Sequence, residues 1–68
     1  MKLILNDEDL KLLESIGIKI QSSEEYSHNE IEDILDEVYL NESTNVGFNE
    51  QLANKYADLA DKIENIIS

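Results

Sequence analysis

The sequence predicts a mostly α-helical protein, a single small domain of three helices spanning residues 1–68. Three observations predict this class. Helix-capping residues stand before three stretches of helical apolar spacing, no proline interrupts any of them, and the 41% apolar content argues against disorder despite the charge. The longest of these stretches is the last one, so we expect the third helix to be central.

The first helix is predicted over residues 7–16. Asn6 is a suitable N-cap, and the acidic residues that follow it favour the positive end of the helix dipole. Gly17 stands where a helix C-terminus prefers a glycine, and Ile18 follows where a Schellman motif prefers an apolar residue. The first-turn acids are Asp7, Glu8 and Asp9, and the apolar positions are Leu10, Leu13 and Ile16.

Two short extended segments flank the first helix. Residues 2–5 are mostly apolar, and residues 18–21 alternate apolar and polar side chains. The connection between them is just long enough for the two to pair as a two-stranded supplement to the helices. Two isolated strands are weak without cover, so the sequence leaves open whether residues 2–5 pair with residues 18–21.

The second helix is predicted over residues 28–41, with the clearest local signal in the chain. Ser27 and Glu30 form an S-x-x-E capping box, and Tyr26 and Ile31 form the hydrophobic staple that accompanies it. One amphipathic stripe then follows the helical period, made of Ile31, Ile34, Leu35, Val38 and Tyr39. A polar loop is expected over residues 41–47.

The third helix is predicted over residues 50–67, with Asn49 as its N-cap. Its apolar side chains cover about 180° of arc, and Lys55, Asp58 and Lys62 have the spacing for ion pairs within the helix. So wide an arc leaves two interpretations: a homodimer through this helix, or cover supplied within the chain. The covering residues would be Leu3–Leu5, Ile18, Ile20 and Phe48.

The distribution of charge is the main clue to function. The net charge is −11, arginine is absent, and no lysine occurs between Ile20 and Asn54. At 100° per residue, the acids of the second helix fill about 160° of arc opposite its apolar stripe. We call this surface the acidic face; its residues are Glu30, Glu32, Asp33, Asp36 and Glu37.

The acidic face has four interpretations: a solvated surface that keeps the protein soluble, a site for a basic protein, a mimic of nucleic-acid phosphates, and a divalent-cation site. We expect a small acidic interaction or regulatory protein that binds a basic protein surface. The alternatives are a structural or oligomerisation module, which would use the apolar face of the third helix, and a nucleic-acid-mimic inhibitor. The expected contact residues are Glu30, Asp33, Asp36, Glu37 and Tyr39.

Several classes of function are not expected. There is no cysteine, and His28 is the single histidine, so we predict no metal site, no cofactor and no Cys-His catalysis. No catalytic motif is present, and we expect no enzyme activity. Five scattered lysines do not make a basic patch, so direct nucleic-acid binding is not expected. With no signal peptide and no membrane span, a cytoplasmic protein is expected.

Overall fold

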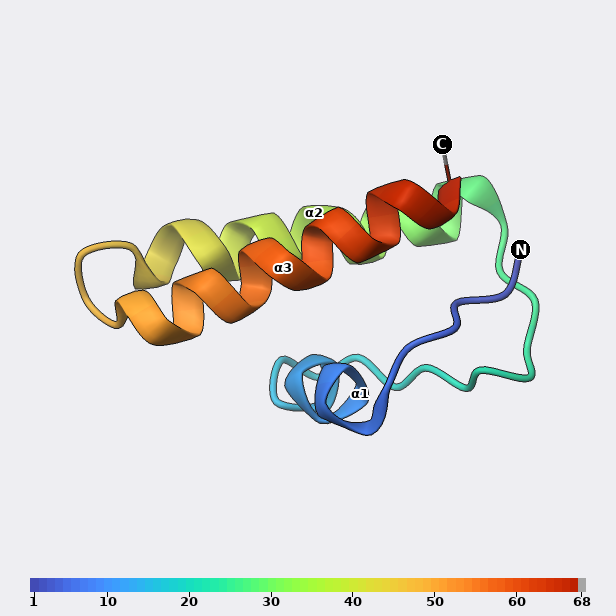
Figure 1. Cartoon of the computed structure of the whole chain (residues 1–68). Coiled ribbons are helices and arrows are strands. Elements are labelled where there is room, and N and C mark those ends of the chain that lie inside the picture. Colours follow the sequence, from blue (N-terminus) through green and yellow to red (C-terminus); the bar gives the residue numbers. More distant parts are fainter. Residues whose placement is uncertain (68) are drawn as a thin grey trace.

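The structure, a computed structural model, describes residues 1–67 and contains three helices. They are α1 (Asp7–Glu14), α2 (His28–Asn45) and α3 (Glu50–Ile67). Helices α2 and α3 form an antiparallel hairpin, and α1 with its flanking segments packs against one side of it (Figure 1). The predicted fold class, a mostly helical three-helix domain, is confirmed.

Helix α1 is capped at both ends by the residues that the sequence indicated. The Asn6 Oδ1 atom accepts the Asp9 N–H at 2.8 Å, and the Asp9 Oδ2 atom accepts the Asn6 N–H at 3.3 Å. At the other end Gly17 has a φ of +83°. The N–H of Ile18 donates to the Leu13 carbonyl at 3.0 Å, which is the long bond of a Schellman motif. This motif turns the chain back toward the hairpin.

The two extended segments do not pair in the way that the sequence left open. Lys2 instead forms an isolated antiparallel bridge with Glu25, just before α2. The backbone of Gln21 is satisfied locally, because its N–H donates to the Tyr26 hydroxyl and its carbonyl accepts the Glu24 N–H. These Gln21 groups are therefore engaged in a local turn and not with residues 2–5.

Helix α2 begins as predicted and continues for one turn more. Both bonds of the capping box are present, at 3.1 Å from the Glu30 N–H to Ser27 Oγ and at 3.0 Å from the Ser27 N–H to Glu30 Oε1. The helix ends at Asn45 rather than near residue 41. Asn41, Thr44 and Asn45 looked like loop residues, but each donates its side-chain hydrogen to a carbonyl four residues earlier.

Helix α3 has the predicted bounds and is the central helix. The Asn49 Oδ1 atom accepts the Leu52 N–H at 3.2 Å, which confirms the predicted cap. Every apolar side chain of its wide arc is buried or half-buried within the chain. Those at its buried centre are Ala53, Tyr56, Leu59, Ala60 and Ile63. All of these except Ala53 form one core cluster with Leu3, Leu5, Leu13, Ile31, Leu35 and Val38.

Two expected cover residues are not part of this core, and the first is Ile4, which is 70% exposed. Ile18 and Ile20 are half-buried against the core, but Phe48 is 88% exposed. The turn that carries Phe48 lies at the end of the hairpin far from both chain termini, where α1 does not reach (Figure 1). The interpretation that Phe48 covers helix α3 was therefore wrong, because no third element stands over that turn.

Candidate functional site

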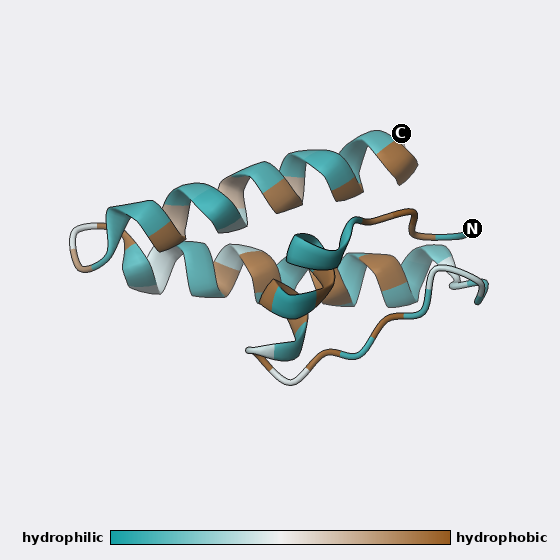
Figure 2. Ribbon diagram, turned by 60° about the horizontal axis from the view of Figure 1, so that its bottom comes forward, coloured by the Kyte–Doolittle hydropathy of each residue, from teal (hydrophilic) through white to brown (hydrophobic). Residues whose placement is uncertain are grey.

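The acidic face lies on the outward side of α2. All five of its residues are exposed, whereas Ile31, Leu35 and Val38 of the same helix are buried against the rest of the chain. Figure 2 shows this alternation, with hydrophobic bands interrupting hydrophilic ones at helical intervals along α2 and α3. The sequence-predicted residues thus share one surface, but they differ in what else they do.

Glu30 serves the fold. Its carboxylate accepts the backbone N–H of Ser27, and it also lies against the Ser27 hydroxyl; these two hydrogen bonds lower the pKa of Glu30 from its ordinary value of 4.5. Glu30 is exposed at the end of the acidic face, so it contributes charge there. Its carboxylate is nevertheless engaged in holding the start of α2, and a partner would meet it in that geometry.

Glu32 is engaged as well, by His28. The His28 Nε2 atom lies 2.7 Å from Glu32 Oε1, one helical turn away, and both side chains are exposed. Asp33, Asp36 and Glu37 differ from these two acids. Within residues 1–67 no ion pair or side-chain hydrogen bond engages their carboxylates.

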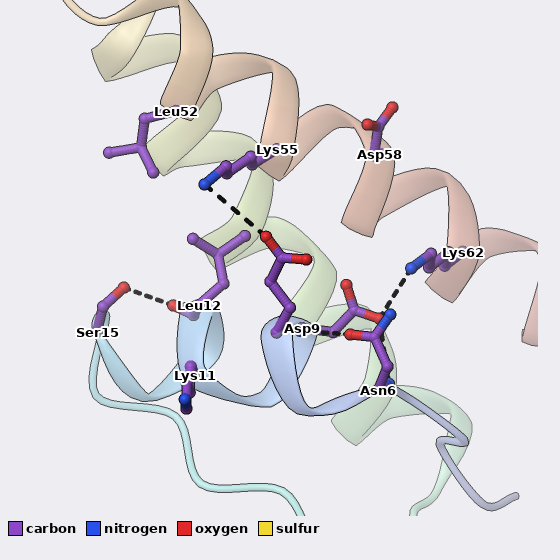
Figure 3. A pocket seen from close by; sticks show the side chains of 10 residues that line it. Asn6, Asp9, Lys11, Leu12, Ser15, Leu52, Lys55, Asp58 and Lys62 are labelled. Carbon is purple, nitrogen blue, oxygen red and sulfur yellow. Dashed lines mark hydrogen bonds and ion pairs between the residues drawn. The ribbon is translucent and has the colours of Figure 1, made fainter.

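The lysines of α3 explain why these three acids have no partner. Lys62 Nζ lies 2.9 Å from Asp9 Oδ2, and Lys55 Nζ lies 3.9 Å from Glu8 Oε1. Both lysines reach toward α1 (Figure 3). The sequence predicted that Lys55 and Lys62 pair with Asp58 in their own helix. That was wrong, because the acids of α1 lie closer than the helix's own aspartate.

The same seam contains a groove of about 510 Å³ between α1 and α3 (Figure 3). Three lysines and three acids line it, so its formal charge is balanced. Two of those lysines are already paired across it. The charged side chains that line this groove therefore join α1 to α3. Its charged lining residues are Glu8, Asp9, Lys11, Lys55, Asp58 and Lys62.

Tyr39 connects the acidic side of α2 to α3. Its hydroxyl donates a hydrogen bond to the Glu64 carboxylate, and this bond, with burial and nearby carboxylates, raises the pKa of Tyr39 to about 12. Tyr39 is 38% exposed. It is therefore both a tether between the two helices and an aromatic surface at the edge of the acidic face.

A shallow hollow lies beside Glu64, the residue that accepts the Tyr39 hydrogen bond. Asp36, Glu32 and Glu64 line it with the apolar side chains of Leu35 and Ile67, and its volume is about 510 Å³. Carboxylates of α2 and α3 therefore line the same hollow as the two apolar side chains. This hollow adds Glu64, which the sequence did not indicate, to the acidic surface around Asp36.

Leu40 is the residue that our sequence reasoning missed. It is 61% exposed, and it follows Asp36 by four residues and Glu37 by three, so it lies on the same outward side of α2. The signal was available, because at 100° per residue Leu40 falls opposite Ile31, in the middle of the acidic arc. The acidic face therefore ends in an exposed apolar residue.

Other kinds of site are not found in the part of the chain that the structure describes. Residues 1–67 contain no group of three acidic or histidine side chains arranged to hold a metal ion. Nor is any helix in this range both long and apolar enough to cross a membrane. Comparisons with protein-family models, curated proteins and solved structures found no match for this chain.

Proposed function

We propose that this protein is a small acidic interaction protein that binds a basic protein surface through the acidic face of α2. One observation carries the proposal. Asp33, Asp36 and Glu37 are exposed side by side, and no lysine among residues 1–67 pairs with them. These three acids would make the contact, with Tyr39 at the edge and Glu30 adding to the field.

The chemistry of such a face is electrostatic steering. Acidic side chains on one surface attract a basic partner from a distance, raise the association rate and disfavour acidic competitors. The net charge of −11 strengthens this field and opposes self-association. Because the contact is solvent-exposed, added salt should weaken the attraction. At physiological ionic strength the Debye length is about 8 Å, and exposed charges farther apart than this are largely screened.

The test is capture of binding proteins by the immobilised chain at low and high salt. A triple variant, Asp33→Asn with Asp36→Asn and Glu37→Gln, removes three charges and keeps the shapes of the side chains. The matched control removes three exposed charges elsewhere, by Glu14→Gln, Glu24→Gln and Asp61→Asn. We expect a basic protein that binds the wild type and the control at low salt, and that is lost from the face variant.

Two results would contradict the proposal: recovery of no basic protein at low salt, or equal loss from both triple variants. The same assay separates the other expectations. Added DNA would displace the captured protein if the face mimics nucleic-acid phosphates. The oligomerisation alternative predicts a mass that rises with concentration and tolerates salt. Its original motive, the wide apolar arc of α3, is accounted for by burial within the chain.

A further inference from the structure

Three large apolar side chains are exposed in the last part of α2 and in the turn that follows it. Leu40 is 61% exposed, Val46 is 63% exposed and Phe48 is 88% exposed. We call these three residues the hairpin end. In the described chain the other large apolar side chain exposed to this degree is Ile4, at 70%, which lies on the N-terminal segment. The three lie within nine positions of the chain, and Phe48 is the most exposed large apolar residue among those described.

The turn that presents Phe48 is held by hydrogen bonds. The Asn45 carbonyl accepts the N–H of Phe48 at 3.0 Å and the N–H of Asn49 at 2.7 Å. Gly47 adopts a φ of +79°, which only glycine accepts without strain. Because the backbone on both sides is fixed, a partner that covers Phe48 would have little chain entropy to remove.

The charges around the hairpin end indicate what kind of surface would cover it. Asp36 and Glu37 precede Leu40 by one helical turn, and Glu42 and Glu50 flank the turn. No lysine lies between Ile20 and Asn54, so nothing basic accompanies these acids in sequence. A second copy of the chain would bring the same acids against them. An apolar surface flanked by basic side chains would complement both features at once.

We propose that the hairpin end is an apolar anchor, which packs on an apolar surface flanked by lysine and arginine on a partner protein. The choice of a basic protein rests on the proposed function of the adjoining acidic face. The acidic face and the hairpin end affect different rate constants of binding. The acidic face sets the association rate and its salt dependence, and the anchor sets the dissociation rate.

A designed probe tests this anchor without a known partner. The probe is a helical peptide with one leucine stripe flanked by lysines, and its control is a peptide of the same composition with the stripe scrambled. Titration into the isotope-labelled full chain is followed by NMR. The amide shifts should concentrate over residues 40–49. Phe48→Ala should weaken binding about tenfold or more, while Ile4→Ala changes it by less than about twofold.

The outcomes separate the anchor from the acidic face. If Phe48→Ala and Leu40→Ala bind the striped peptide as tightly as the wild type does, the anchor is refuted whatever the acidic variants do. If the triple acidic variant alone loses affinity, the proposed function stands and the anchor fails. Sedimentation of the free protein supplies a further check. A dimer that disappears in Phe48→Ala would overturn the proposal by making a second copy the occupant.

Discussion

The two sides of this small molecule use the same residue types in opposite ways. At the α1–α3 seam, Asp9 meets Lys62 and Leu13 is buried. On the outer side of α2, Asp33 forms no ion pair within residues 1–67, and Leu40 is exposed. The comparison teaches that the acidic composition alone does not separate structural acids from available ones. The positions of the few lysines separate the two kinds of acid. Lys55 and Lys62 form ion pairs with acids of α1 and with none of α2.

The largest contrast is expected between two leucines. Leu13→Ala opens a cavity at a fully buried position and should lower the free energy of unfolding by about 2–5 kcal/mol. Leu40→Ala removes an exposed side chain and should change it by less than about 0.5 kcal/mol. Urea denaturation measures both. A loss at Leu40 as large as the loss at Leu13 would mean that the hairpin end supports the fold, and the comparison would fail.

The next contrast is between two aspartates. Asp9→Ala removes the acceptor for the Asn6 N–H and for the Lys62 ammonium, at a buried position. We expect it to lower the free energy of unfolding by about 1–3 kcal/mol. Asp33→Ala should stay within about 0.5 kcal/mol of the wild type. Thermal unfolding of the two variants gives the comparison, and equal effects would remove the distinction between the seam and the face.

Glu30 is an intermediate case between the two kinds of acid, because it lies on the acidic face and yet has a hydrogen-bond partner, Ser27, within the chain. Ser27→Ala deletes the cap and should lower the free energy of unfolding by about 1 kcal/mol at neutral pH. The Ser27 hydrogen bonds depress the folded-state pKa of Glu30, so their stabilisation is present above the ordinary value of 4.5. It is lost as the pH falls through the lower folded-state pKa.

The check is acid unfolding of the wild type and of Ser27→Ala from pH 7 downward. The difference between them should be constant at neutral pH and should shrink below about pH 4.5. A difference that is the same at pH 7 and well below pH 4 would show that the Ser27 hydroxyl does not contribute to the lowered pKa of Glu30, because Ser27→Ala keeps the backbone N–H that donates to this carboxylate.

Much of the fold could be predicted because its signals are local. The capping box at Ser27, the Schellman glycine at position 17 and the Asn49 cap each depend on residues within one helical turn. The end of α2 was misplaced for a local reason too. Asn and Thr favour loops in general, but here Asn41, Thr44 and Asn45 bond back to the helix carbonyls, so their donors are satisfied without a loop.

The candidate site could be predicted only in part, because the rest depends on tertiary placement. The helical period put Asp33, Asp36 and Glu37 on one surface. It could not reveal that Lys55 and Lys62 would turn toward α1, which is what leaves those acids without partners. The exposure of Phe48 likewise depends on where α1 ends in space, and no pattern along the chain encodes that distance (Figure 1).

The smallest expected effect probes the face itself. Asp33 and Glu37 are like charges one turn apart, so Glu37→Gln should raise the free energy of unfolding by about 0.2–0.5 kcal/mol at low salt. Glu8→Gln, which breaks the exposed contact with Lys55, should lower it slightly or leave it unchanged. Both differences should vanish in about 1 M salt, where screening is strong.

The sign of the change in unfolding free energy for Glu37→Gln, together with the capture assay, decides the role of the acidic face. If Glu37→Gln destabilises the protein, that carboxylate has a favourable interaction within the chain, and the contrast with Glu8 disappears. If it stabilises the fold and also weakens capture of a basic protein, the repulsion is retained at the expense of stability. Such a trade between stability and binding is typical of functional surfaces. A gain in stability with unchanged capture would instead leave the acidic face with solubility as its role.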